Sequence, residues 1–510
     1  MGKSIMFQGT ASNVGKSFLV AAFCRIFKED GLTVSPFKSQ NMALNSYITD
    51  EGLEMGRAQV VQAEAAGKVP SVKMNPILLK PHADKQSQVI IMGKVYKDMT
   101  AMEYHEFKPQ LATRIKEIFE ELQVENDVVV IEGAGSPAEI NLRDKDIVNM
   151  GMAELADAPV ILIGDIDRGG VFASLVGTML LLTEEERKRV KGVLINKFRG
   201  DLKILEPGLK MLEDLIKVPV LGVIPYTMVD IEDEDSLAGR LNSTKPKGKK
   251  SLEIEVICLP HLSNFTDFNV LEIQEDVSLH YVTRGQTLGN PDLVILPGTK
   301  NTIGDLLYLR ESGLGEAIKA YSQKGGLLFG VCGGYQLLGK KLYDSKGVET
   351  GISEIEGLGL LDITTRFEEE KVTTQVEGRV KVLPAPIGGH LEGEKVVGYE
   401  IHMGLTDLGK EAKPFLEIQK KLGEKVSYEE GAINSEGTVM GTYLHGIFDE
   451  PGFIRGLLNA LRQKKGLEEN QKEALSFKAY KEQQYTKLAQ AVRSHVDLEA
   501  IYQIMRGEEG

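Results

Sequence analysis

The stretch Gly-Thr-Ala-Ser-Asn-Val-Gly-Lys-Ser at positions 9–17 lies between two segments of different pattern. Positions 4–8 form a short apolar run that is typical of a buried strand, and the residues from Lys16 to about Glu29 predict a helix. Glycines in such a strand-to-helix turn let backbone N–H groups point inward at phosphate oxygens, and the helix N-terminus favours negative charge. The stretch therefore predicts a phosphate-binding loop at the start of an α/β domain.

The predicted nucleotide contacts in this loop are Gly9, Thr10, Gly15, Lys16 and Ser17. Lys16 would reach the β- and γ-phosphates of ATP or GTP, and the Ser17 hydroxyl would ligate Mg²⁺. The strict pattern requires glycine at position 10, where this chain has Thr10, and the nearest glycine is Gly9. The alternative interpretation is a glycine-rich turn that binds nothing.

Three polar residues elsewhere in the first half are candidates for the same site. Glu132 ends the apolar run 128–131, where a carboxylate would lie beside the loop and hold Mg²⁺ directly or through water. Lys38 follows the second predicted strand and is a second phosphate contact. Asn196 follows the predicted strand 192–195, where it would contact a purine. The alternatives are a solvent-exposed glutamate at position 132 and a helix-capping asparagine at position 196.

Strands and helices alternate through the first 225 residues. Several predicted strands are continuous runs of Val, Ile and Leu, as in parallel sheets buried on both faces. A second alternating segment begins near position 252. We therefore predict an α/β protein with two doubly wound parallel-sheet domains. The predicted boundaries are a P-loop synthetase domain at 1–227, a charged linker at 228–251, a second α/β domain at 252–450 and a helical extension at 451–510.

The second half contains Gly-Val-Cys-Gly-Gly at positions 330–334, directly after the apolar run 326–329. Small neighbours allow the sharp turn of a nucleophile elbow, which exposes a thiol at the head of a helix and lowers its pKa. Cys332 is therefore the predicted catalytic nucleophile, whereas Cys24 and Cys258 fit inert structural residues. The backbone N–H of Gly333, and that of Gly298 in the turn 297–299, would form the oxyanion hole.

A thiol nucleophile needs a base that takes its proton and returns it to the leaving group. His445 lies just past the predicted strand 438–443, about 110 residues downstream of the thiol, and is the predicted catalytic partner of Cys332. His402 is the competing candidate.

These features together resemble known families. The loop and the sequence Glu-Gly-Ala-Gly at 132–135 resemble dethiobiotin synthetase-like enzymes, and the order of Pro-Gly turn, Cys elbow and late His is similar to class I, triad-type glutamine amidotransferases. With the further stretches 38–42, 75–81, 132–150, 165–170 and 260–267, nearly the whole chain resembles the cobyric acid synthases. Such amidotransferases usually carry Glu two residues after the His, where this chain has Ile447, so the third member of the triad stays unassigned.

The resemblance implies an ATP-, Mg²⁺- and glutamine-dependent ligase of cobalamin biosynthesis with no tightly bound prosthetic group. The corrinoid acid acceptor would be adenosylcobyrinic acid a,c-diamide, amidated at carboxylates b, d, e and g. ATP would convert each carboxylate into an acyl phosphate, and ammonia released from glutamine at Cys332 would capture it. The alternative enzyme is a cobyrinic acid a,c-diamide synthase. More distant alternatives are a partitioning-type ATPase, which would carry a lysine where this chain has Ala11, and an amidotransferase that uses free ammonia.

Composition limits the other classes of function. The chain has 510 residues, 42% of them apolar, and a formal charge of −14, which argues against general binding to nucleic acids or membrane surfaces. Three cysteines make no disulfide framework, no run of 18 apolar residues could span a bilayer, and the N-terminus lacks a signal-peptide layout. We expect a cytoplasmic enzyme, and its size and acidity are typical of enzymes that form homo-oligomers.

Overall fold

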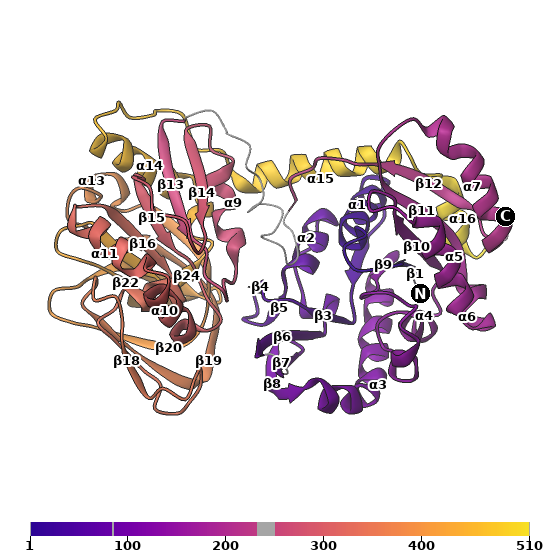
Figure 1. Ribbon diagram of the computed structural model, residues 1–510, viewed down its shortest axis with the longest axis horizontal. Coiled ribbons are helices and arrows are strands. Elements are labelled where there is room, and N and C mark those ends of the chain that lie inside the picture. The colour runs from indigo at the N-terminus through magenta and orange to yellow at the C-terminus, as the bar shows by residue number, and fades with distance from the viewer. Residues whose placement is uncertain (1, 84–85, 232–249, 509–510) are drawn as a thin grey trace. The chain divides into compact units, whose positions relative to one another are not determined.

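The computed structural model describes residues 2–83, 86–231 and 250–508, and the chain divides into two compact units. Unit 1 contains Met1–Ala43, Glu54–Glu234 and Lys481–Gly510, and unit 2 contains Leu44–Leu53 and Asp235–Tyr480. Both units carry the predicted parallel sheet with helices (Figure 1), so the predicted fold class is confirmed. Most of the predicted linker 228–251 lies outside the described residues.

The central sheet of unit 1 has six parallel strands in the order β12-β11-β10-β1-β9-β2. Every residue of β9 and β10 is buried, because helices cover both faces of such a sheet. The strands are β1 (Lys3–Gly9), β2 (Val34–Phe37), β9 (Val128–Glu132), β10 (Val160–Asp165), β11 (Val190–Phe198) and β12 (Val220–Pro225).

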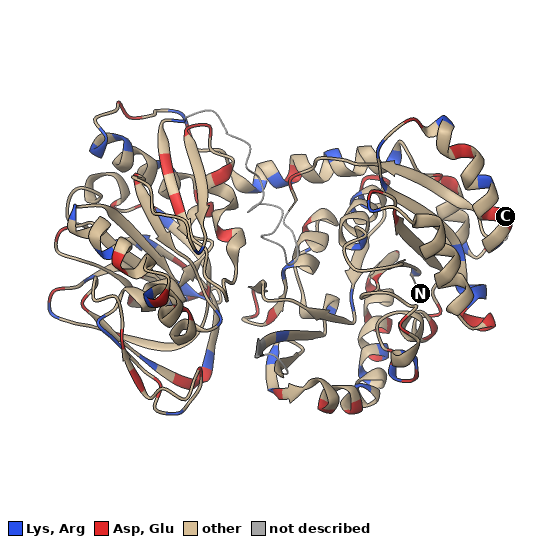
Figure 2. Ribbon diagram, viewed as in Figure 1, with Lys and Arg blue, Asp and Glu red and all other residues tan. Residues whose placement is uncertain are grey.

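The helices of the first 225 residues are α1 (Lys16–Glu29), α2 (Arg57–Ala65), α3 (Ala101–Glu125), α4 (Met150–Leu155), α5 (Val171–Leu181), α6 (Glu184–Arg189) and α7 (Leu202–Ile216), with short 3-10 turns η1 (Val72–Met74) and η2 (Ile140–Lys145). Of these helices, α1, α3, α5 and α7 were predicted, whereas α2, α4 and α6 were not. Figure 2 shows acidic and basic residues side by side along α6, which begins with three glutamates and ends with three basic residues. This order complements the helix dipole, and a capping box at Thr183 and Glu186 adds to it.

A second, four-stranded sheet in unit 1 has the order β3-β6-β7-β8 and was not predicted. The predicted strand 89–92 falls in its antiparallel hairpin and does not join the parallel sheet. The chain reverses at Met92 and Gly93, where both residues have positive φ, as two-residue hairpin turns require. Because of this reversal, the predicted strand pairs with the strand that directly follows it. The strands are β3 (Gln40–Met42), β6 (Ile77–Ala83), β7 (Gln86–Ile91) and β8 (Lys94–Thr100), and β5 (Glu54–Gly56) precedes α2.

The sheet of unit 2 has five parallel strands in the order β14-β13-β15-β16-β23 and continues into mostly antiparallel strands that were largely unpredicted. The parallel strands are β13 (Leu252–Ile257), β14 (Val277–Val282), β15 (Leu293–Leu296), β16 (Leu327–Val331) and β23 (Val439–Thr442). The others are β17 (Lys341–Tyr343), β18 (Glu354–Glu356), β19 (Ile363–Val380), β20 (Lys395–Leu408), β21 (Lys413–Lys421), β22 (Glu424–Ile433) and β24 (Leu444–His445). Strand β4 (Ser46–Ile48) also belongs to unit 2 but lies outside this sheet.

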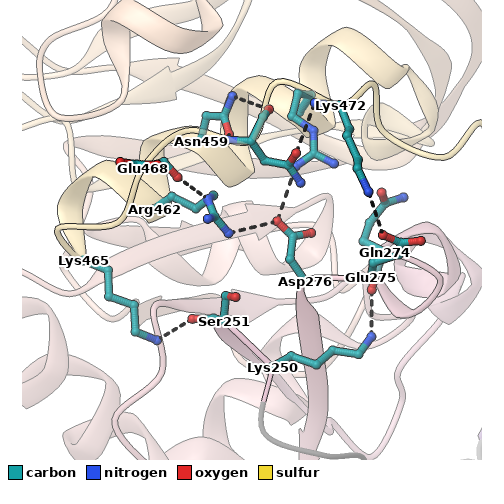
Figure 3. A network of polar contacts seen from close by, with 12 residues as sticks. Lys250, Ser251, Gln274, Glu275, Asp276, Asn459, Arg462, Lys465, Glu468 and Lys472 are labelled. Atoms are coloured by element: carbon teal, nitrogen blue, oxygen red, sulfur yellow. Dashed lines mark hydrogen bonds and ion pairs between the residues drawn. The ribbon is translucent and has the colours of Figure 1, made fainter.

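The helices of unit 2 pack against this sheet. They are α9 (Asn269–Glu272), α10 (Thr302–Glu311), α11 (Leu314–Gln323), α12 (Gly333–Leu338), α13 (Gly388–Leu391) and α14 (Pro451–Lys464), with 3-10 turns η3 (Phe265–Phe268) and η4 (Ile447–Asp449). Polar contacts hold α14 beside β13 and β14 (Figure 3): Asp276 accepts from Arg462 at 3.4 Å, and Lys465 donates to the carbonyl of Ser251 at 2.8 Å.

The C-terminal residues differ from the predicted helical extension 451–510. Helix α14 buries Phe453 and Leu457 in the core of unit 2, whereas Lys481–Gly510 belongs to unit 1. There α15 (Phe477–Arg493) and α16 (Leu498–Arg506) flank a break at which Val496 forms a bridge with Gly222 and Asp497 caps α16. The C-terminal residues divide between the two units because their apolar side chains are buried in different cores. Those of α14 lie in the core of unit 2, and those of α16 and most of α15 lie in a core of unit 1.

Among the described residues, none of the helices has the length and apolar character needed to cross a bilayer.

Candidate active sites

The predicted phosphate loop joins β1 to α1 in unit 1, and its backbone conformation requires glycine. Gly15 has φ 100°, and a Cβ there would lie 2.2 Å from the amide nitrogen of Asn196. A Cβ on Gly9 would lie 2.5 Å from Val14 and 3.0 Å from Nζ of Lys16. The two glycines therefore let the loop close tightly over the lysine.

Two of the predicted nucleotide contacts are engaged with the protein itself. The N–H of Thr10 donates to the carbonyl of Ile163 in β10 at 3.0 Å, so this N–H does not face the inside of the loop. The amide nitrogen of Asn196 donates to the carbonyl of Val14 at 2.9 Å and so supports the loop from beneath. Contact of Asn196 with a purine stays a prediction.

Lys16 links the loop to the segment after β9. Its Nζ donates to the carbonyl of Ala11 at 3.1 Å and to that of Gly135 at 2.9 Å. The ammonium group therefore lies between the phosphate loop and the Glu-Gly-Ala-Gly sequence. This position suits a cation that neutralises phosphate oxygens.

Glu132 is the polar centre of the unit 1 site. One carboxylate oxygen accepts from Ser17 Oγ at 2.8 Å and from Lys38 Nζ at 2.9 Å, and the other accepts from Gln62 Nε2. Its side chain is 1% exposed, so the solvent-exposed interpretation of this residue is wrong. Burial of a carboxylate requires such partners, because an unpaired buried charge is costly.

The donor set around Glu132 fits Mg²⁺ in its chemistry. Mg²⁺ prefers oxygen ligands and usually keeps several waters and phosphate oxygens, and Ser17 and Glu132 offer two oxygens 2.8 Å apart. Asp165, at the end of β10, is a second carboxylate near the loop and pairs with Lys197, which also donates to the carbonyl of Asn13. Within the described ranges, no group of three or more His, Cys, Asp or Glu side chains is arranged to hold a metal.

The predicted thiol elbow is present in unit 2. Cys332 has φ 51° and ψ −110°, a conformation that non-glycine residues rarely adopt, and it lies at the head of α12. A Cβ on Gly334 would lie 1.9 Å from the carbonyl oxygen of Leu296, and one on Gly330 would lie 2.7 Å from the backbone of Tyr335. The glycines flanking the thiol are therefore required by close backbone approach.

His445 lies beside Cys332, and an unpredicted carboxylate lies on its other side. The two side chains lie close enough for Cys332 to raise the pKa of the His445 imidazole. Nδ1 of His445 lies 2.6 Å from Oδ2 of Asp267, and Oδ1 of Asp267 accepts from the N–H of Gly446 at 3.1 Å. Because Asp267 engages Nδ1, the nitrogen available to the thiol is Nε2. The three residues form the arrangement of a Cys-His-Asp triad.

Electrostatics in this triad favour a protonated imidazole. Burial lowers the pKa of His445, but the charge of Asp267, the charge of Cys332 and the hydrogen bonds to both outweigh it and raise the pKa to about 10. A protonated His445 stabilises a neighbouring thiolate and holds a proton for a leaving amine.

The competing histidine has other partners. Nδ1 of His402 lies 2.7 Å from the carbonyl of Gly404, and its ring stacks on Tyr443 with centroids 3.7 Å apart. Its Nε2 lies 3.6 Å from Glu400 and has no hydrogen-bond partner among the residues that the structure describes. The structure thus joins His445, and not His402, to Cys332.

The two glycines predicted for the oxyanion hole border the same site. A Cβ on Gly298 would lie 3.0 Å from Cε1 of His445, and one on Gly333 would lie 3.0 Å from the backbone nitrogen of Thr299. The turn 297–299 therefore runs along the head of α12, next to the imidazole. The oxyanion role of these N–H groups stays a prediction.

Comparison with known proteins gives the family. The model of the CobQ/CobB/MinD/ParA nucleotide binding domain matches residues 5–236, and that of the CobB/CobQ-like glutamine amidotransferase domain matches residues 253–453. The chain is 60% identical over 505 residues to a cobyric acid synthase of Alkaliphilus metalliredigens, covering 99% of this chain and all of that relative. The chain belongs to the cobyric acid synthase family. A cobyric acid synthase of Photorhabdus laumondii is 56% identical over 99% of this chain and 98% of its own length.

Membership of the cobyric acid synthase family confirms the resemblance, the enzyme class and the pairing of a nucleotide-binding domain with a glutamine amidotransferase domain. The third triad position differs from the usual amidotransferase pattern in a way that the structure explains. Ile447 is fully buried in the apolar core, and Asp267 approaches His445 from the turn η3. The signal available for Asp267 was its place within the stretch 260–267, which carried the family resemblance.

Other residues at the two sites were missed from the sequence. Gln62 came with no motif of its own, and Asp165 lay in the stretch 165–170, which carried the family resemblance but gave no role for this residue. In unit 2, Glu430 accepts from the hydroxyl of Thr442 and, at 2.7 Å, from the N–H of Tyr443. Burial and the nearby charge of Glu400 raise the pKa of Glu430 to about 8.

Glu430 should make the stability of unit 2 depend on pH. Between about pH 4.5 and pH 8 the folded protein keeps a proton on Glu430 that the unfolded chain releases, so this residue lowers the free energy of unfolding as pH rises. Glu430→Gln removes that titration. We expect the free energy of unfolding of the variant to exceed that of the native protein by a few kcal/mol as pH rises to about 8. Calorimetry of the unit 2 transition measures this difference. Glu429→Gln, which changes an exposed neighbour paired with Lys381, should show no such trend.

Proposed function

We propose that the protein catalyses ATP- and glutamine-dependent amidation of corrinoid carboxylates. The acceptor is adenosylcobyrinic acid a,c-diamide, and the reaction forms amides at carboxylates b, d, e and g. The observation that carries this proposal is that one chain of this family holds both a phosphate loop, whose Lys16 reaches the segment after β9, and a thiol elbow with His445, which Asp267 contacts at 2.6 Å. Each site alone is insufficient for the reaction.

Unit 1 supplies the synthetase site in this proposal. A carboxylate does not react with ammonia at neutral pH, because it lacks a leaving group. Transfer of the γ-phosphoryl group of ATP to the carboxylate gives an acyl phosphate and ADP. Lys16 and Lys38 stabilise the charge on the transferring group, while Gly9, Thr10 and Gly15 shape the loop. Ser17 and Glu132 would hold Mg²⁺, which when bound neutralises charge on the phosphate oxygens.

Unit 2 supplies ammonia. The Cys332 thiolate attacks the side-chain amide carbon of glutamine, and His445 gives its proton to the departing nitrogen, which leaves as NH₃. Asp267 holds the imidazole, and the N–H groups of Gly298 and Gly333 stabilise the oxyanion. Water, deprotonated by His445, then cleaves the glutamyl thioester to glutamate. The NH₃ attacks the acyl phosphate, and the C–O bond to phosphate breaks as the C–N bond forms.

Product analysis tests the proposal directly. The purified protein is incubated with ATP, Mg²⁺ and glutamine, and with either cobyrinic acid or adenosylcobyrinic acid a,c-diamide. We expect the diamide to gain four amide groups by mass spectrometry and cobyrinic acid to remain unamidated at a and c. Formation of the a,c-diamide from cobyrinic acid would instead favour a cobyrinic acid a,c-diamide synthase. No product from either acid would contradict the proposed function.

A further inference from the structure

A segment from the first half of the sequence folds as part of unit 2. Leu44–Leu53, which we call the strap, lies within the residues matched by the nucleotide binding domain, yet it groups with the glutamine amidotransferase unit. It contains β4 and is held along its length: Thr373 Oγ1 donates to the carbonyl of Gly52 at 2.9 Å, and Gln375 Nε2 donates to that of Ile48. The strap is therefore part of the structure around the thiol site.

The first half of the strap holds the turn that carries Asp267. Oδ1 of Asn45 accepts from the N–H of Asn264 at 2.8 Å, and Oδ1 of Asn264 accepts from the N–H of Ser46 at 3.0 Å. Asn264 has φ 54° and caps η3, and its carbonyl accepts from the N–H of Asp267 at 3.1 Å. This reciprocal asparagine contact, buried on both sides, fixes a left-handed residue whose conformation sets the position of Asp267.

The strap also holds the ring on which His445 rests. The carbonyl of Ser46 accepts from the hydroxyl of Tyr399 at 3.2 Å, and the Tyr399 ring stacks on the His445 imidazole with centroids 5.2 Å apart and planes 18° from parallel. Ile48 packs against Tyr399 and Ile401, and the carbonyl of Ile401 accepts from Cys332 Sγ at 3.5 Å.

We propose that the strap positions the glutaminase triad, with Asn45 and Tyr399 as positioning residues. Asn45 acts through Asn264 on Asp267, and Tyr399 acts through its ring on His445. Both act on the Asp267–His445 hydrogen bond of 2.6 Å, whose geometry directs Nε2 at the thiol. A misplacement of about 1 Å in such a site costs on the order of a hundredfold in rate. This inference rests on the proposed function, because it assumes that unit 2 hydrolyses glutamine.

The test uses the full-length protein with single substitutions. Asn45→Ala removes the acceptor for Asn264, and Tyr399→Phe removes the hydroxyl that donates to Ser46 while keeping the ring. We expect kcat for glutamine hydrolysis to fall by about tenfold to a hundredfold in Asn45→Ala and by less in Tyr399→Phe, with KM for glutamine unchanged. The matched control is Thr373→Val, which removes a strap contact away from Asp267 and His445 and should keep the native kcat.

A pH profile separates positioning from simple destabilisation. In Asn45→Ala the Asp267 carboxylate is held less firmly beside His445, so its charge interacts less strongly with the imidazole. The pKa of His445 should therefore fall in this variant. The alkaline limb of kcat/KM, where His445 loses the proton it gives to ammonia, should then move to lower pH. Amidation with ammonium chloride, which does not use the triad, should keep its native rate in both variants.

Native kcat in both variants would overturn the inference, and so would an equal loss in Thr373→Val or an equal loss of ammonium-dependent amidation. Failure of the native protein to hydrolyse glutamine would instead contradict the proposed function.

Discussion

Replacing Cys332 with alanine is expected to abolish the use of glutamine while leaving ammonium-dependent amidation unchanged. The thiol forms the only covalent bond to glutamine in the proposed mechanism, and water activated by His445 alone is a poor substitute. We expect glutamine-dependent product formation to fall on the order of a thousandfold or more. The measurement compares amide formation with glutamine and with high ammonium chloride in the same assay.

The control for this substitution is Cys258→Ala. Burial and the charge of Asp305 raise the pKa of the Cys258 thiol, so it stays protonated and unreactive at neutral pH. This variant should use glutamine as the native protein does. Normal glutamine use by Cys332→Ala would rule out the thiol mechanism, and loss of ammonium-dependent amidation in it would contradict the division of the reaction between two sites.

The elements of the fold that the sequence predicted well are those with uniform patterns. The run 128–131 in β9 is apolar throughout, and α1 follows a glycine loop, so period and composition agree with the structure. Helix α2 was not predicted because eight of its nine residues are buried, Arg57, Gln59 and Gln62 among them. A helix buried on all sides has no amphipathic stripe for periodicity to detect.

The predicted strand 396–402 covers half of β20, whereas β19 was missed beyond its first two residues for a related reason. Strand β19 alternates through polar residues such as Glu368–Glu370, and its pairing with β20 depends on a chain reversal that local sequence does not specify. Long antiparallel strands with one solvated face carry a weaker signal than buried parallel strands.

The residues of the candidate sites were likewise predicted where they lie in a short local motif and missed where their partner is distant in the sequence. Lys16, Ser17 and Cys332 lie in short motifs whose spacing is fixed by one turn, so the sequence alone identifies them. Asp267 lies 178 residues before His445, and the contact forms only because η3 and β24 meet in the folded unit. No spacing rule predicts such a contact, because the intervening chain builds most of unit 2.

Lys16→Ala is expected to abolish amidation with glutamine and with ammonium chloride alike. The ammonium group spans the phosphate loop and Gly135, where its charge would stabilise the transferring phosphoryl group for every nitrogen donor. Loss of one such charged donor from a preorganised site costs on the order of a hundredfold to a thousandfold in rate. The measurement is amide formation with each donor, together with nucleotide affinity by titration calorimetry.

Lys73→Ala is the matched control, because Lys73 is a partly exposed lysine whose ion pairs with Glu121 and Glu125 contribute little to stability or chemistry. Folding of the Lys16 variant is checked by the thermal unfolding of unit 1. Lys16 donates to the carbonyl oxygens of Ala11 and Gly135, and in its absence Glu132 keeps its contacts with Ser17, Lys38 and Gln62. Amidation with ammonium chloride at the native rate in Lys16→Ala would therefore exclude the phosphate loop from the chemistry, whatever the state of the thiol site.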